Sequence, residues 1–187
     1  MTIDSKDCRV PPDKRVNLTK WATIVDPYSK STKEKKLLHQ HLEKLCSLQQ
    51  LFYASHSYAL LSIFQGMDGA GKDGAIRHVM SGVNPAGCEV FSFKQPSAEE
   101  LDHDFLWRTV CRLPERGRIG IFNLSYYEEV LVVRVHPEIL RSHGLPEELR
   151  DQKNIWEQRY RSIADLEKHL HRNSRGAVTG DHATIKS

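Results

Sequence analysis

Two hydrophobic periods alternate along the chain and predict its secondary structure. Apolar residues at spacings of three, four and seven predict an amphipathic helix over about 31–52, with a stripe formed by Leu38, Leu42, Leu45 and Phe52. The apolar run at 58–64 has no clean alternation, as expected for a strand buried on both faces of a parallel sheet. A glycine-rich turn follows this strand, and a short helix is predicted over about 73–81.

The same alternation continues downstream. Short strands are predicted at 89–93 and 118–122, and helices at about 97–112, 126–133 and 146–172. Alternation of strands with helices favours an α/β fold, in which helices flank a parallel sheet.

Two of these helices carry more detailed expectations. Ser97 and Glu100 have the spacing of a capping box, and the helix that they open should bury Leu101, Phe105, Leu106 and Val110. The last helix should have one apolar side, made of Trp156, Tyr160, Ile163 and Leu166.

The 187 residues suit one domain. We expect an N-terminal arm at 1–20, which carries two prolines and many charges. A core should cover 21–173, and an irregular tail is expected at 174–187, where the periodicity stops.

Composition adds little about partners. The net charge is only +3, so a polyanionic ligand would have to meet a local basic patch. The chain has no apolar run of about 18 residues and no apolar segment near Met1, and we expect neither a membrane nor nucleic acid as a partner. The four cysteines show no C-x-x-C spacing, which favours reduced thiols in a cytoplasmic protein.

The most informative segment is the glycine-rich turn at 66–73, which reads G-M-D-G-A-G-K-D and matches G-x-x-x-x-G-K. Glycines let backbone amides turn inward around phosphate oxygens, and the following helix directs its positive dipole end at the same anion. We predict a phosphate site formed by Lys72 with Gly66, Gly69, Ala70, Gly71, Asp73 and Gly74. The alternative is a glycine-rich strand-to-helix turn with an exposed lysine.

Asp73 stands where this pattern normally has Ser or Thr, whose hydroxyl holds magnesium. A metal ion would therefore need other oxygens, and Asp68 inside the loop is the natural candidate. Mg²⁺ prefers one or two carboxylates together with phosphates and water. The alternative for Asp68 is a turn-forming aspartate with local backbone hydrogen bonds.

A second polar segment follows the strand predicted at 118–122. Asn123 comes directly after that strand, and Glu128 and Glu129 come one helical turn later. Ligand sites of open α/β sheets lie outside the carboxyl ends of the strands, so Asn123 is predicted to be a neutral oxygen ligand. The alternative is a helix start capped by Asn123 or Ser125, with glutamates that the helix dipole favours.

Arginine and histidine give weaker signals. Guanidinium groups suit phosphate oxygens, and the candidates are Arg108, Arg112, Arg116, Arg118 and Arg134. The ten histidines show no metal-ligand spacing, so no zinc site is predicted.

In combination, these motifs resemble the polyphosphate kinase 2 family. The resemblance runs from about Val16 to Asn173 and rests on the loop at 66–74 and on five further segments. These are V-N-P at 83–85, P-S-A-E-E-L at 96–101, F-L-W-R at 105–108, L-P-E-R-G at 113–117 and F-N-L-S-Y-Y-E-E at 122–129.

The resemblance implies a thymidylate-kinase-like P-loop fold. It implies phosphoryl transfer between inorganic polyphosphate and AMP or ADP, or from ATP in reverse, with Mg²⁺ and in a homo-oligomer. Lys72 and the loop backbone would hold the transferred phosphate, and Asp68 would serve the metal or activate the acceptor. Asn123 takes the second-motif position and, together with Glu128, goes with the branch that accepts AMP as well as ADP. Arg134 would bind phosphate.

Two departures from the family pattern favour an alternative. The family has an arginine at the position of Leu124, and it continues past Asn173 into another strand, a basic lid and more helices, which 174–187 does not resemble. We therefore expect a fold that is incomplete at the C-terminus. The alternative is a non-catalytic remnant that binds phosphate without efficient turnover. A third possibility is a nucleoside-monophosphate kinase that uses ATP, against which the absence of Ser or Thr after Lys72 counts.

Overall fold

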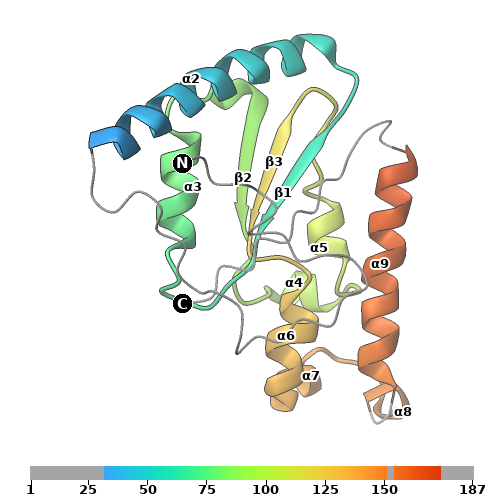
Figure 1. Cartoon of the computed structure of the whole chain (residues 1–187). Coiled ribbons are helices and arrows are strands. Elements are labelled where there is room, and N and C mark those ends of the chain that lie inside the picture. Colours follow the sequence, from blue (N-terminus) through green and yellow to red (C-terminus); the bar gives the residue numbers. More distant parts are fainter. Residues whose placement is uncertain (1–31, 151–153, 174–187) are drawn as a thin grey trace.

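A computed structural model describes residues 32–150 and 154–173 of the chain (Figure 1). Its centre is a parallel sheet of three strands in the order β1-β3-β2. The strands are β1 (Leu60–Phe64), β2 (Cys88–Ser92) and β3 (Ile119–Asn123). This confirms the predicted α/β fold with a parallel sheet flanked by helices. The predicted arm at 1–20 and tail at 174–187 lie outside the described residues.

The central strand is β3, and it is the one buried on both faces. Phe122 is 0% exposed, whereas the residues of β1 are mostly half-buried, because in the described part of the chain β1 pairs with β3 alone. The sequence predicted a strand buried on both faces at 58–64, but most residues of β1 are only half-buried. The register pairs Phe64 of β1 and Ser92 of β2 with Asn123, so all three strands end at the same level.

One face of the sheet is covered by α2 (Thr32–Ser55) and α3 (Lys72–Met80). Ile76 of α3 packs against Ile119 and Ile121 of β3, and Phe52 of α2 joins the same cluster. Figure 1 shows α2 across the end of the sheet where the strands begin, and α3 alongside the strands. The apolar stripe predicted for the first helix is present, although its first member, Leu38, is exposed.

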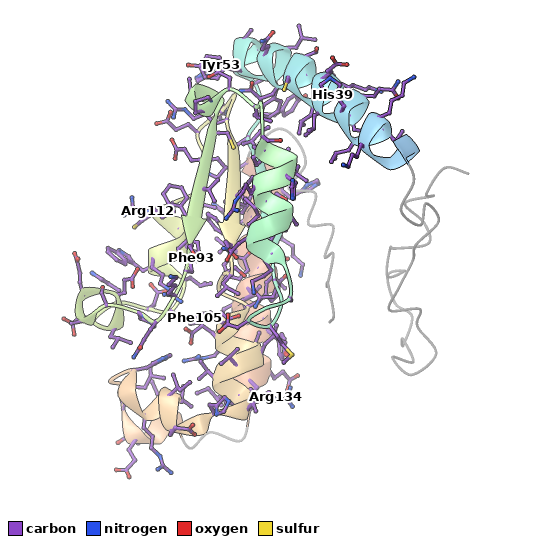
Figure 2. All side chains as sticks on the ribbon, turned by 90° about the vertical axis from the view of Figure 1, so that its left-hand side faces the viewer. His39, Tyr53, Phe93, Phe105, Arg112 and Arg134 are labelled. Carbon is purple, nitrogen blue, oxygen red and sulfur yellow. The ribbon has the colours of Figure 1, made fainter. Side chains whose placement is uncertain are left out.

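The other face carries an aromatic cluster. Phe122 packs against Leu61 and Phe93, and the guanidinium of Arg112 lies 5.4 Å from the ring centroid of Phe91. Figure 2 shows Arg112 and α3 on opposite sides of the sheet. Arg112 therefore lies on the other face of the sheet from α3, and its prediction as a phosphate ligand is wrong.

The predicted helix at 97–112 is wrong as one element. It forms two short helices, α4 (Ala98–Leu101), opened by the predicted capping box, and α5 (Trp107–Val110). Between them, the Asp104 carboxylate accepts a hydrogen bond from the Leu106 amide at 2.9 Å, a local contact that competes with the helical one. Val110, expected in the core, is 43% exposed as a result of the break.

The elements described after β3 are all helices. They are α6 (Glu128–Val135), α7 (Pro137–Ser142), α8 (Glu147–Arg150) and α9 (Ile155–Asn173), and a short 3₁₀ turn, η2 (Pro85–Gly87), lies earlier in the chain. The pattern missed α7 and predicted α8 and α9 as one helix. Tyr126 packs against Ile163, which belongs to α9. The hydroxyl groups of Tyr126 and Tyr127 also donate hydrogen bonds to Glu167 of α9, at 3.0 and 2.6 Å. These contacts fix α9 to the start of α6.

Candidate phosphate-transfer site

The phosphate loop, residues 66–73, connects β1 to α3 at the carboxyl end of the sheet (Figure 1). Gly69 and Gly71 have φ values of +78° and +84°, which side-chain-bearing residues rarely adopt. Gly71 is also the N-cap of α3, and the space beside both glycines is open. The loop therefore presents backbone to open space at the N-terminus of a nine-residue helix.

Lys72 is 7% exposed, which rules out the reading as a turn with an exposed lysine. Its Nζ donates to the carbonyl oxygens of Gly66 and Met67, at 2.7 and 2.8 Å. The ammonium group thus lies inside the turn of the loop, where the loop's own carbonyls are its acceptors.

Asp73 and Asn123 meet across 50 positions of sequence. Asn123 Nδ2 donates to Asp73 Oδ1 at 2.5 Å, which joins the first turn of α3 to the end of β3. A carboxylate only accepts hydrogen bonds, so the amide NH₂ group must face it. Asn123 Oδ1 is left buried, with no hydrogen-bond partner in the described part of the chain.

A second polar connection involves Gln65, which sequence reasoning did not single out. Its Nε2 donates to Glu128 Oε1, and its Oε1 accepts from the Ser125 hydroxyl at 3.2 Å. Gln65 directly precedes the motif, but no local pattern indicates a partner 63 residues away. The N-cap of α6 is Tyr127, which has no side-chain cap. Ser125 Oγ accepts from the Tyr127 amide just before the helix, so the alternative of a capped helix start holds in part for Ser125 and not for Asn123.

Glu128 is half-buried and faces the loop. Burial raises its pKa above the ordinary value, and the charge of Asp68 acts in the same direction. The hydrogen bond from Gln65 and the charges of Lys72 and Arg108 oppose that increase in pKa. Asp68 itself is exposed at the tip of the loop, in a turn closed by the Ala70 amide and the Met67 carbonyl.

The candidate arginines differ in how close they lie to the phosphate loop. Arg108 is buried, donates to the Lys94 carbonyl at 2.7 Å and lies over the ring of Phe93, and its charge acts on Glu128. Arg118 instead pairs with Glu89 at 2.6 Å. Arg134 is exposed in the last turn of α6, whereas Glu128 is in the first turn (Figure 2). No contact in the described residues brings Arg134 to the loop.

Leu124 follows Asn123 with a φ of +65°, an uncommon conformation for a bulky residue. Its amide donates to the Phe64 carbonyl at 2.9 Å, and its side chain packs against the cluster of Leu61, Phe93 and Phe122. The residue therefore brings no charge to the loop.

Beside this site lies a cavity of about 100 Å³, between α4 and α5 on one side and α6 and α9 on the other. Arg108, Glu129, His143 and Arg159 line it, among other residues. Arg159 donates to Glu129 Oε2 at 2.7 Å, and His143 Nδ1 is 3.5 Å from the same oxygen. The Glu129 carboxylate is thus paired with the Arg159 guanidinium, and Arg108 lies 3.8 Å from Glu100 Oε2.

Among the described residues, no group of three or more His, Cys, Asp or Glu side chains is placed to hold a metal ion. In the same part of the chain, no helix is long and apolar enough to cross a membrane.

Comparison with known proteins identifies the family. The sequence model described as Polyphosphate kinase 2 matches residues 28–179. The chain belongs to the polyphosphate kinase 2 family. This confirms the resemblance inferred from the motifs.

Two curated relatives and a solved structure set the extent of the likeness. An ADP-polyphosphate phosphotransferase of Rhodopseudomonas palustris is 59% identical over 92% of this chain and 60% of its own length. An AMP/ADP-polyphosphate phosphotransferase of Meiothermus ruber is 39% identical over 88% of this chain and 58% of its own. Polyphosphate kinase 2 from Arthrobacter aurescens superposes with a TM-score of 0.76 at 32% identity, covering 91% of this chain and 57% of that one. This member of the polyphosphate kinase 2 family thus spans about 60% of the length of such relatives.

Proposed function

We propose that this chain transfers a phosphoryl group between inorganic polyphosphate and AMP or ADP, or from ATP in the reverse direction. The observation that carries the proposal is the buried Lys72 inside a glycine loop, beside a carboxylate and an amide at the ends of neighbouring elements. The names of the two relatives, both polyphosphate phosphotransferases, support the same substrates.

Lys72 and the loop would bind the transferred phosphate. Phosphate oxygens carry more negative charge than the carbonyls of Gly66 and Met67, so they would compete for the ammonium group. The free amides at the start of α3 would add donors for the same phosphate, and Gly66, Gly69, Ala70, Gly71 and Gly74 would leave the backbone accessible.

The residues around the loop fit Mg²⁺. Asn123 Oδ1 is a buried oxygen without a partner in the described part of the chain, and Asp68 offers an exposed carboxylate. Mg²⁺ binds such oxygens together with substrate phosphates and water. We propose that Asp68 and Asn123 hold it, and that Asp73 acts by keeping the Asn123 amide turned. When bound, the ion would neutralise charge on the transferring phosphates.

Glu128 would bind the acceptor nucleotide, because its carboxylate can accept hydrogen bonds beside the loop. Arg134 as a phosphate ligand and a homo-oligomer remain predictions from the resemblance, and a cytoplasmic location remains a prediction from the cysteine pattern. The preferred nucleotide is a matter for the assay, since one relative is named for ADP and the other for AMP and ADP.

The test is a product assay with long-chain polyphosphate, AMP or ADP, and Mg²⁺. We expect ADP or ATP to form, and Lys72→Ala to abolish transfer and weaken polyphosphate binding in calorimetry at fixed salt. The control is Lys168→Ala, which removes an exposed lysine of α9. Products from ATP and AMP alone, but not from polyphosphate, would replace this proposal with a nucleoside-monophosphate kinase.

A second candidate is phosphate binding without efficient turnover, and Leu124 is the observation that favours it. The Leu124 side chain packs in an apolar cluster and carries no charge. An arginine at this position could neutralise phosphate charge. If wild-type protein binds polyphosphate in calorimetry but forms no product, and Leu124→Arg forms product, this second candidate is correct for the chain as it stands.

A further inference from the structure

A directional chain of hydrogen bonds runs from the turn after β3 to Glu128. The Tyr127 amide donates to Ser125 Oγ at 3.2 Å, and the Ser125 hydroxyl donates to Gln65 Oε1 at the same distance. Gln65 Nε2 then donates to Glu128 Oε1. Ser125 is fully buried, whereas Gln65 and Glu128 are half-buried, so water is excluded from the serine end of these contacts.

The chemistry of the groups allows only one direction. Ionised Glu128 can only accept, so the NH₂ group of Gln65 must face it and the amide oxygen must face Ser125. The hydroxyl oxygen of Ser125 already accepts from the Tyr127 amide, and its proton is directed to Gln65. By donating to Gln65 Oε1, Ser125 favours the orientation of the Gln65 amide that the ionised carboxylate requires.

We propose that Gln65, oriented by Ser125, is a positioning residue that holds the Glu128 carboxylate beside the phosphate loop; the inference rests on the proposed function of that loop. Gln65 belongs to the segment that leads from β1 into the loop, and Glu128 opens α6. Their contact ties the carboxylate to the same backbone segment that carries Gly66 and Asp68. Under the proposed function, this contact would fix where an acceptor bound by Glu128 lies relative to the phosphate loop.

The pKa of Glu128 is raised overall, and the hydrogen bond from Gln65 limits that rise by favouring the ionised carboxylate. Burial and Asp68 raise its pKa, whereas Gln65, Lys72 and Arg108 oppose that rise. Of these opposing groups, Gln65 is the one that contacts the carboxylate directly. Removing the amide should therefore change both the position and the titration of Glu128.

The experiment compares Gln65→Met, Ser125→Ala and the control Gln50→Met, which alters an exposed glutamine of α2. The first readout is the titration of the Glu128 carboxyl carbon by NMR in labelled, ligand-free protein. Gln65→Met should raise the Glu128 pKa by about one pH unit, the size expected when a hydrogen bond to a charged group is lost. Ser125→Ala should move the Glu128 pKa in the same direction by less, and Gln50→Met should leave it unchanged.

The second readout is the pH dependence of kcat and KM for the nucleotide. We expect Gln65→Met to lower kcat/KM about tenfold and to move the acidic limb of the profile upward by the same interval as the NMR titration. A lowered melting temperature with an unmoved Glu128 titration would overturn the inference and leave a purely structural contact. A shifted titration in a protein that transfers no phosphate would keep the positioning of Glu128 and sink the proposed function instead.

Discussion

Glu128 and Glu129 are neighbours in the first turn of α6, yet their side chains have different surroundings. Glu129 is enclosed by Arg159 and His143 next to a cavity, with only 4% of its side chain exposed. Glu128 faces the phosphate loop and is held by a neutral amide, with no cation within ion-pair distance in the part of the chain that the structure describes. A paired charge stabilises the fold, whereas a charge that keeps a neutral partner stays available to a ligand.

The strongest way to break this comparison is to remove Glu129. Glu129→Ala should lower the free energy of unfolding by about 3–5 kcal/mol, because it leaves the Arg159 guanidinium buried without its carboxylate. Urea denaturation measures the change. The control Glu43→Ala removes an exposed glutamate paired with His39 and should cost less than about 1 kcal/mol.

A double variant sharpens that prediction. Glu129→Leu with Arg159→Met replaces the buried pair by apolar side chains and should recover most of the lost stability. If the double variant is as unstable as Glu129→Ala, then apolar side chains cannot replace the ion pair. The fold would then require both charges in the cavity wall.

The matching change at Glu128 should affect activity rather than stability. Glu128→Gln should reduce kcat/KM about tenfold to a hundredfold, as expected for loss of a hydrogen bond from a charged group. Its unfolding midpoint in urea should remain close to that of the wild type. A large loss of stability with unchanged kinetics would show that the two glutamates do not differ in role.

His143, which lies beside Glu129, should make the stability of the protein depend on pH. Burial lowers the pKa of His143, with Arg159 and Arg108 acting in the same direction and Glu129 against it. The unfolded chain then binds the His143 proton more readily, so stability should fall as the pH drops through about 6.5. His143→Asn should flatten the dependence of the unfolding free energy on pH between about 6.5 and 5, and an unchanged slope would contradict this.

The smallest expected effect is the pH dependence that Glu128 gives to stability. Its folded pKa is raised, so the stabilising contribution is present below the ordinary value of 4.5 and is lost as the pH rises through the raised value. The melting temperature of Glu128→Gln should therefore increase relative to wild type between pH 4 and pH 7. Parallel melting curves across that interval would argue that Glu128 is not desolvated.

Much of the site could be predicted because its main motif is local. The loop at 66–73 lies within one strand-to-helix turn, so its glycines and Lys72 were identified by spacing alone. Gln65 was not singled out, and Arg108 was named only as one of five candidate phosphate ligands, because each acts through partners that only folding brings near. Arg159 was missed for a related reason: the pattern marked Tyr160 for the apolar side of its helix, but the buried neighbour is the arginine that pairs with Glu129.

The sequence by itself determined the α/β fold, the phosphate loop and the family, because periodicity and short motifs depend on residues close together in the chain. Tertiary structure alone decided the strand order, the break between α4 and α5, and the meeting of Asp73 with Asn123. It also decided which glutamate faces the loop. Adjacent residues of a helix point in different directions, and only the packing of α6 between the β1 exit and α9 gives Glu128 the amide and Glu129 the arginine.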